Sequence, residues 1–183
     1  DIGAVSEDGT LSDTGALTIS DTDDGEDVFN TQTGAASTGG YGTVDLDAAG
    51  NWTYTLDNAN ATVQALSGGE TLGDSFTAVS ADGTTQLVTI TITGTDDAPV
   101  IGGVDTGAIT EDVDPDLDGL LETAGALTVS DTDTGETVFT AGTINGTYGD
   151  LVIDATGNWS YAADNTQAVI QNLPAGATLT DTL

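Results

Sequence analysis

The sequence predicts an all-β protein made of two tandem β-sandwich repeats. Three observations lead to this prediction: an internal duplication, apolar residues that alternate with polar ones over short segments, and turn-forming residues between those segments. Apolar residues make up 37% of the 183 residues, so the excess of acidic residues does not indicate a disordered chain. We place the first repeat at residues 1–98 and the second at residues 99–183, both within the usual size of a domain.

The duplication is carried by three matched pairs of motifs. These are GAVSED (3–8) with GAITED (107–112), GALTISDTD (15–23) with GALTVSDTD (125–133), and GNWTY (50–54) with GNWSY (157–161).

The second repeat differs from the first in length. It carries an insertion between residues 112 and 123, and Leu183 aligns with Phe76 of the first repeat. We therefore expect the second repeat to be truncated, lacking its last strands. We also expect these 183 residues to be a window on a longer tandem chain, with the second repeat completed by further sequence or by a strand of a neighbouring molecule.

Period-two alternation predicts the strands of the first repeat. Such alternation, with threonine on the outer face, favours half-buried antiparallel strands. The inward-facing residues in order are Leu17 and Ile19 (within 15–20), Val44 and Leu46 (41–47), Trp52, Tyr54 and Leu56 (51–56), and Val88, Ile90 and Ile92 (87–93). Turn signals at 47–50, at 81–83 and at Asn145-Gly146 separate strands of this kind.

One segment breaks the alternation. Residues 58–66 (NANATVQAL) have helical spacing behind Asn58, a residue type that often caps helices. We predict one short helical turn there and a second at 165–173.

The charge pattern excludes several classes of function. The chain has 31 Asp and Glu residues and no Lys, Arg, His or Cys. Without basic side chains, nucleic acid and anionic lipid are poor partners. Without His or Cys there is no usual catalytic pair and no usual zinc site. Every acidic cluster lies at a linker or turn, so we expect no enzymatic activity. No segment is long and apolar enough to insert in a membrane.

Three longer segments resemble the VCBS repeat, a module of bacterial surface and secreted proteins. They are GALTISDTDDGE (15–26), YGTVDLDAAGNWTYTLDNANATVQALSGGETLGDSF (41–76) and VTITITGTDDAPVI (88–101). The resemblance implies a cadherin-like or immunoglobulin-like fold for each repeat. It also implies long tandem arrays in adhesins and related calcium-dependent proteins, an extracellular or cell-surface location, and type I secretion.

The segment TDDAP (95–99) is similar to the acidic linkers of cadherin repeats, whose carboxylates share calcium ions. Asp96 and Asp97 are adjacent in an extended segment, and Pro99 stiffens its exit. Calcium accepts six to eight oxygen ligands without a demanding geometry. We predict a calcium site here, and the alternative is a solvated acidic linker.

The motif SDTD supplies a second pair of candidate ligands. Asp131 and Asp133 resemble the Asp-x-Asp motif of cadherins and would close the site that Asp96 and Asp97 begin. The counterparts of this pair in the first repeat are Asp21 and Asp23. Glu136 is a further candidate just after the motif. The alternative is a turn, because Asp often bonds its own backbone there.

Two further groups of acids are candidate ligands. The pairs Glu7-Asp8 and Glu111-Asp112 lie near the starts of the two repeats, where the alternative is a charge that protects a sheet edge. The inserted DPDLDG (114–119) matches the opening of a calcium loop through Asp114, Asp116 and Asp118. Its twelfth position is Gly125, not Glu, so a plain acidic loop is the alternative there.

The sequence therefore predicts a structural spacer of a long extracellular fibre, stiffened by calcium, whose partners are neighbouring repeats of the same chain. The alternative is a self-assembling subunit of a filament, sheath or surface layer, with copies of itself as partners. A third class, a carbohydrate-binding module, would need exposed aromatic residues. We instead expect Trp52, Tyr54, Trp159 and Tyr161 to lie in the cores, because they alternate with polar residues.

Overall fold

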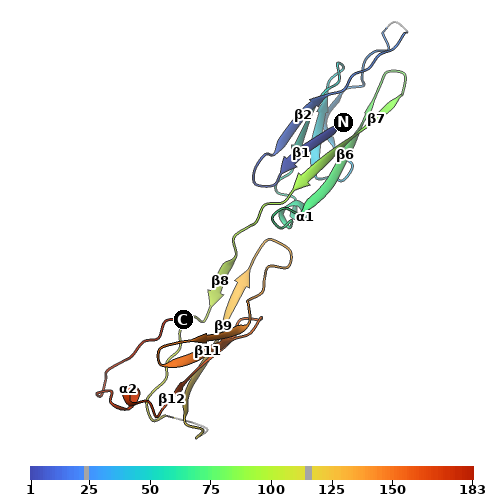
Figure 1. The fold of residues 1–183 in the computed structure, drawn as a ribbon. Coiled ribbons are helices and arrows are strands. Elements are labelled where there is room, and N and C mark those ends of the chain that lie inside the picture. Colours follow the sequence, from blue (N-terminus) through green and yellow to red (C-terminus); the bar gives the residue numbers. More distant parts are fainter. Residues whose placement is uncertain (23–24, 114–116) are drawn as a thin grey trace. The chain divides into compact units, whose positions relative to one another are not determined.

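The structure is a computed structural model that describes residues 1–22, 25–113 and 117–183 (Figure 1). The chain forms two compact units. The first consists of residues 1–98 together with 132–134, and the second of residues 99–131 together with 135–183.

The first unit is a sandwich of two sheets. One contains β1 (Ile2–Ser6), β6 (Thr71–Val79) and β7 (Thr85–Thr93) in the order β1-β7-β6. The other contains β2 (Ser12–Ala16), β3 (Gln32–Ala36), β4 (Gly42–Leu46) and β5 (Asn51–Leu56) in the order β2-β5-β4-β3. The predicted all-β class is confirmed.

One pairing in this unit differs from the expected antiparallel arrangement. β1 runs parallel to β7, with Ile2 opposite Thr89 and Ser6 opposite Thr93, and the two strands lie side by side in Figure 1. The other pairs in the two sheets are antiparallel. The first and last strands of the unit are therefore neighbours.

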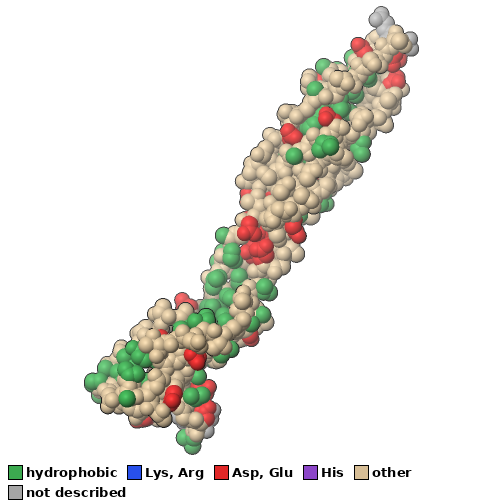
Figure 2. Space-filling view, in the orientation of Figure 1, with side chains coloured by type: hydrophobic (Ala, Val, Ile, Leu, Met, Phe, Trp, Pro, Cys, Tyr) green, Lys and Arg blue, Asp and Glu red, His purple; other side chains and the backbone are tan. Residues whose placement is uncertain are grey.

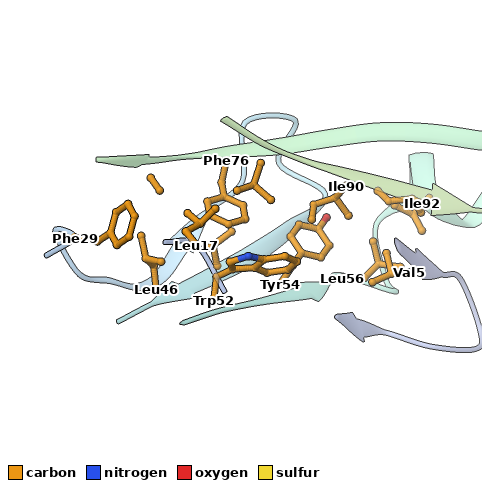
Figure 3. Close-up of a cluster of buried hydrophobic side chains, with 14 residues drawn as sticks. Val5, Leu17, Phe29, Leu46, Trp52, Tyr54, Leu56, Phe76, Ile90 and Ile92 are labelled. Carbon is orange, nitrogen blue, oxygen red and sulfur yellow. The ribbon is translucent and has the colours of Figure 1, made fainter. Parts of the chain in front are cut away.

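The core of the first unit lies between the two sheets (Figure 3). Phe76 of β6 and Trp52 of β5 pack edge to face, with their ring centres 5.7 Å apart. The predicted inward-facing residues of 41–56 and 87–93 are all buried, which confirms those strand faces: Val44, Leu46, Trp52, Tyr54, Leu56, Val88, Ile90 and Ile92.

The strand predicted at 15–20 is wrong in its position. β2 ends at Ala16, opposite the first residue of β5, Asn51. Beyond Ala16 no residue of β5 lies opposite, because the segment that precedes β5 turns at Gly50. The Leu17 N–H therefore donates to the carbonyl of Gly50 in that turn. Gly50 has a φ of +91°, and a Cβ there would lie 2.4 Å from the Leu17 carbonyl oxygen, so the turn requires glycine.

The predicted helical turns are present but their capping differs. α1 spans Ala61–Gln64, and its N-cap is Asn60, whose side chain accepts a hydrogen bond of 2.9 Å from the Thr62 N–H. The prediction of Asn58 as the cap is therefore wrong, because Asn58 bonds Asp8 instead. α2 spans Ala168–Gln171 and has no side-chain cap. Neither helix within the described residues is long and apolar enough to cross a membrane.

The second unit contains one five-stranded sheet in the order β10-β11-β12-β9-β8. β9 (Leu120–Ser130) is its longest strand and pairs with β12 over its first part and with β8 over its last part. The other strands are β8 (Val100–Gly103), β10 (Gly142–Asn145), β11 (Gly149–Ile153) and β12 (Asn158–Asp164).

No second sheet covers this one within residues 99–113 and 117–183. Residues 106–110, which align with β1, form no strand there. In the first unit β1 is held by its pairing with β7. No described segment of the second unit aligns with β7, so residues 106–110 have no equivalent partner strand. The buried core is consequently small and consists of Leu121, Ala163 and Ile170, with Ile109 and Tyr161 packed against it. Figure 2 shows hydrophobic side chains gathered on the surface of this unit.

Candidate metal centre

The backbone of Glu7 is fixed from both sides at the end of β1. Its N–H donates to the carbonyl of Thr93 at 3.0 Å, and its own carbonyl accepts a hydrogen bond of 2.7 Å from the Thr95 hydroxyl. These two bonds anchor Glu7 to the last strand of the first unit and to the segment that follows it. The side chain is wholly buried, at 0% exposure.

The carboxylate of Glu7 is only half satisfied. Oε1 accepts a hydrogen bond of 3.2 Å from the Gln64 side chain, whereas Oε2 is buried and has no hydrogen-bond partner among the described residues. Burial raises the pKa of Glu7, and the negative charges of Asp8, Asp97 and Asp133 raise it further. A buried polar atom without a partner costs about 1–3 kcal/mol, and more for a charged group.

Asp8 is held beside Glu7 in a left-handed conformation with a φ of 48°. Its N–H donates to Asn58 Oδ1 at 3.0 Å, and Asn58 Nδ2 donates back to Asp8 Oδ1 at 2.6 Å. The reciprocal bonds compensate a backbone conformation that is uncommon for residues other than glycine. Asn58 therefore positions a candidate ligand, a role that the sequence alone did not assign to it.

Asp97 completes the cluster in the first unit, and Asp133 lies beside Asp97. The N–H of Asp97 donates to Asp133 Oδ2 at 2.8 Å, and Asp133 is 2% exposed. The segment 132–134 belongs to this unit, where the Thr134 N–H reaches the carbonyl of Ala65 at 3.3 Å. Glu7, Asp8 and Asp97 each offer a carboxylate oxygen, and these three oxygens lie within 4.8 Å of one another.

This donor set fits a hard divalent cation. Calcium is bound by six to eight oxygens, with carboxylates in one- or two-oxygen modes. The chain has no Lys, Arg or His, and Figure 2 accordingly shows red side chains but no blue or purple ones. No basic side chain can therefore neutralise the cluster, which leaves a bound cation or a proton.

Among the other predicted ligands of the first unit, Asp96 offers a carboxylate oxygen within 4.8 Å of an oxygen of Asp133. Asp96 is exposed and passes close to Gly68, where a Cβ would lie 3.1 Å from the Cβ of Asp96. Asp21 is exposed, and Asp23 lies outside the described residues.

The second unit contains the remaining predicted ligands. Asp131, Glu136 and Glu111 are half-buried. Asp112 has a φ of 59° and accepts hydrogen bonds from Asn165 and Gln171, so it repeats the arrangement of Asp8.

The inserted loop is described only in part. Asp114 and Asp116 lie outside the described residues. Asp118 is exposed, and its carboxylate accepts a hydrogen bond of 2.8 Å from the Leu120 N–H. That local bond is typical of a turn.

The aromatic residues are placed as expected for a core. Trp52 is 2% exposed, Tyr54 is 0% exposed and Trp159 is 7% exposed, while Tyr161 is half-buried. The rings of Trp52 and Tyr54 are therefore not available to stack on a glycan.

Residues 1–94 match the model of the bacterial cadherin-like domain. The chain belongs to the bacterial cadherin-like domain family. This cadherin-like chain is thus related to extracellular adhesion-type repeats, a class whose members typically bind calcium and are typically not enzymes.

Solved structures similar to this cadherin-like chain include protocadherins. The protocadherin gammaB7 EC3-6 cis-dimer is 17% identical with a TM-score of 0.49, over 89% of this chain and 37% of that one. The protocadherin GammaB4 extracellular domain is 19% identical with a TM-score of 0.45, over 94% of this chain and 27% of that one. The chain thus spans less than two fifths of the length of these structures. A search of curated proteins finds none that matches it.

Proposed function

We propose that this chain is a structural spacer in a long extracellular bacterial fibre of the adhesin type, and that calcium stiffens it. The observation that carries the proposal is the buried Oε2 of Glu7, which lacks a hydrogen bond and lies in a cluster of carboxylates. A calcium ion bound by Glu7, Asp8, Asp97 and Asp133 would satisfy that oxygen and offset the repulsion among the four charges.

The ion would also connect parts of the chain that are far apart in sequence. Glu7 follows β1, Asp97 follows β7, and Asp133 follows β9. Binding at these residues would therefore add to the hydrogen bonds that already join these segments and would restrict them further, as a spacer requires. Within the family we assign both repeats to the VCBS type, from motifs such as GALTISDTD (15–23) and GNWTY (50–54). We further assign an extracellular location reached by type I secretion.

Calcium titration tests the proposal. A site with a dissociation constant of about 0.1 mM, in about 10 mM calcium, would add roughly 2.7 kcal/mol to the free energy of unfolding of the first unit. We expect calorimetry to show calcium binding that magnesium does not reproduce, and chelator to lower the melting temperature. An unchanged melting curve in chelator at low salt would overturn the proposal.

Matched variants separate a metal site from general charge repulsion. Asp97→Asn should remove the calcium-dependent rise in stability, whereas Asp105→Asn, an exposed acid outside the cluster, should keep it. Glu7→Gln should raise the stability in chelator, because it removes a buried charge, and should abolish the response to calcium. If Asp105→Asn weakens the response as much as Asp97→Asn does, only net charge matters.

The alternative is a self-assembling module of a filament, sheath or surface layer. The observation that favours it is the exposed apolar groove of the second unit, lined by residues such as Leu151 and Ile153. Light scattering distinguishes the two functions, because a spacer stays monomeric in calcium whereas an assembling module grows with concentration.

A further inference from the structure

The end of β10 carries a residue pair that the candidate metal centre does not use. Asn145 is the last residue of β10, it is exposed, and Gly146 follows it. Asparagine is a thermolabile residue, because the backbone nitrogen of the next residue can attack its side-chain amide. Glycine at that next position has no Cβ and so leaves the approach open. This is the one Asn-Gly pair among the 183 residues.

The turn that follows β10 requires glycine at position 146. A Cβ there would overlap the Asp181 carboxylate and would lie 2.6 Å from the carbonyl oxygen of Gly149. A larger residue after Asn145 would therefore displace the backbone of the turn or the Asp181 side chain. The packing of the turn thus fixes the reactive pair in place.

A hydrogen bond holds the attacking nitrogen while the turn is closed. The Gly146 N–H donates to the carbonyl of Gly149 at 2.8 Å. Attack on Asn145 requires this nitrogen to lose its proton and to face the side-chain carbonyl carbon, and the bond to Gly149 opposes both changes. Reaction therefore has to follow a local opening of the turn.

The carboxylate of Asp181 keeps this turn closed. It accepts hydrogen bonds from the Thr147 N–H at 2.8 Å, the Tyr148 N–H at 2.9 Å and the Tyr161 hydroxyl at 2.9 Å. Hydrogen bonds to an ionised acceptor are stronger than those between neutral groups. The frequency with which the turn opens thus depends on Asp181.

The first unit supplies an internal comparison. In its equivalent hairpin Ala36 lies opposite Thr43, whereas in the second unit Asn145 lies opposite Asp150. Ala36 is followed by Ser37, so the first unit has an equivalent turn without the reactive pair.

We propose that Asn145 is a self-modification site, which converts to aspartate or isoaspartate when the turn held by Asp181 opens. The Gly146 nitrogen bonds to the side-chain carbonyl carbon of Asn145. The bond from that carbon to the side-chain nitrogen breaks, and ammonia leaves with the proton of the Gly146 nitrogen. Water then adds to either carbonyl of the cyclic imide and one C–N bond breaks, which yields a carboxylate, an amide N–H and a proton.

The product weakens the edge of the sheet. Its new carboxylate lies opposite Asp150 in the pairing of β10 with β11. Like charges directly opposite one another in a sheet are destabilising, and the chain has no basic side chain to offset them. Because the conversion is irreversible, the loosened form of this edge accumulates with the age of the chain.

Peptide mapping of the full chain by mass spectrometry tests the proposal. The chain is incubated at mildly alkaline pH, folded or in denaturant, and the converted fraction of Asn145 is followed with time. We expect conversion to be on the order of 100-fold slower in the folded chain, because opening of the turn limits it. Asp181→Asn should speed conversion in the folded chain by on the order of 10-fold, since an amide replaces the ionised acceptor. The matched control Asp74→Asn, which changes the aligned aspartate of the first unit, should leave the rate unchanged.

Two variants of Asn145 separate the chemistry from its consequence. Asn145→Gln should block conversion, because its longer side chain closes a less favourable ring, and amide exchange in β10 and β11 should match that of the unconverted parent. Asn145→Asp should reproduce the faster exchange of the converted chain.

Equal conversion rates in the folded and denatured chains would overturn the proposal, as would equal rates in the parent and Asp181→Asn. A third result would also contradict it. If Asp181→Asn speeds amide exchange in β9 and β12 as much as it speeds conversion, unfolding of the whole unit sets the rate, and the turn does not.

Discussion

The two units place the same residue types in the same local geometry but bury them to different extents. Gly50 turns against the ring of Phe29 in the first unit, and Gly157 turns against the ring of Phe139 in the second, both with a φ near +90°. Yet, among the described residues, the buried core cluster of the first unit has fourteen members and that of the second has three. Local sequence therefore sets the turns and the strand faces, whereas burial depends on the second sheet.

The largest expected difference between the units concerns an aligned pair of apolar residues. Phe76→Ala should cost the first unit about 3–5 kcal/mol of unfolding free energy, since Phe76 is 3% exposed and packs on Trp52. Leu183→Ala should cost the second unit only about 0.5 kcal/mol, because Leu183 is 44% exposed. Each unit has one tryptophan, so denaturant unfolding followed by fluorescence in Trp159→Phe and Trp52→Phe backgrounds measures them separately. Equal losses would show that the second unit is as closely packed as the first.

Acid should lower the stability of both units through two aligned aspartates, Asp74 in the first unit and Asp181 in the second. Burial acts to raise the pKa of Asp74, but hydrogen bonds from Ser37, Gly39 and Ser75 outweigh it and lower the pKa. The N–H groups of Tyr148 and Thr147 lower the pKa of Asp181 to about 2.

A carboxyl group whose pKa is lower in the folded state stabilises the fold above its ordinary pKa of 3.8 and loses that effect as the pH falls toward the folded value. Unfolding free energy should therefore fall as the pH drops below about 4 in both units, and in the second unit this fall should continue to about pH 2. Asp74→Asn should flatten this dependence only in the first unit, and Asp181→Asn only in the second.

At neutral pH we expect Asp74→Asn to cost roughly 1.5–3 kcal/mol, the usual contribution of hydrogen bonds to a charged group. Unit-specific tryptophan fluorescence across the pH range measures these effects. If Asp74→Asn altered the pH dependence of the second unit, or Asp181→Asn that of the first, the two carboxyl groups would not act independently.

The smallest difference concerns the two helical turns. Asn60→Ala should cost about 1 kcal/mol, because the Asn60 side chain caps α1, whereas Asn60→Ser should be nearly neutral. The N-cap of α2 in the second unit makes no side-chain hydrogen bond. The unfolding transition of that unit, followed by Trp159 fluorescence, should be the same in the Asn60 variants as in the parent chain. Equal losses for the Ala and Ser variants would indicate that Asn60 acts through its contact with Gly40 and not through the cap.

Periodicity was sufficient to predict the strand faces but not the strand partners. Val88, Ile90 and Ile92 alternate so regularly that their burial follows from the sequence. The parallel pairing of β1 with β7 joins residues more than eighty positions apart, and no local pattern encodes it. Asn58 and Asn60 are both plausible caps, and only the contact of Asn58 with Asp8 distinguishes them.

The candidate site was accessible from the sequence only through its acids. The absence of basic residues points to a cation, and the family resemblance predicts that Asp97 and Asp133 share a site. The roles of Gln64 and Thr95, which hold Glu7, depend on contacts between distant segments. The role of Asn58 does have a signal in the sequence, because the pair of Asn58 with Asp8 recurs as Asn165 with Asp112. Each asparagine bonds the equivalent aspartate of its own unit.

The parallel pairing of β1 with β7 has a mechanical consequence. Tension applied at the two ends of residues 1–93 pulls β1 and β7 in opposite directions along their common axis. The five paired positions from Ile2 to Ser6 are then loaded in shear, all at once and not one after another. Resistance to pulling is governed by the rate of unfolding under load, and a joint rupture of this kind has a high barrier. We therefore expect the first unit to resist tension applied at its two ends.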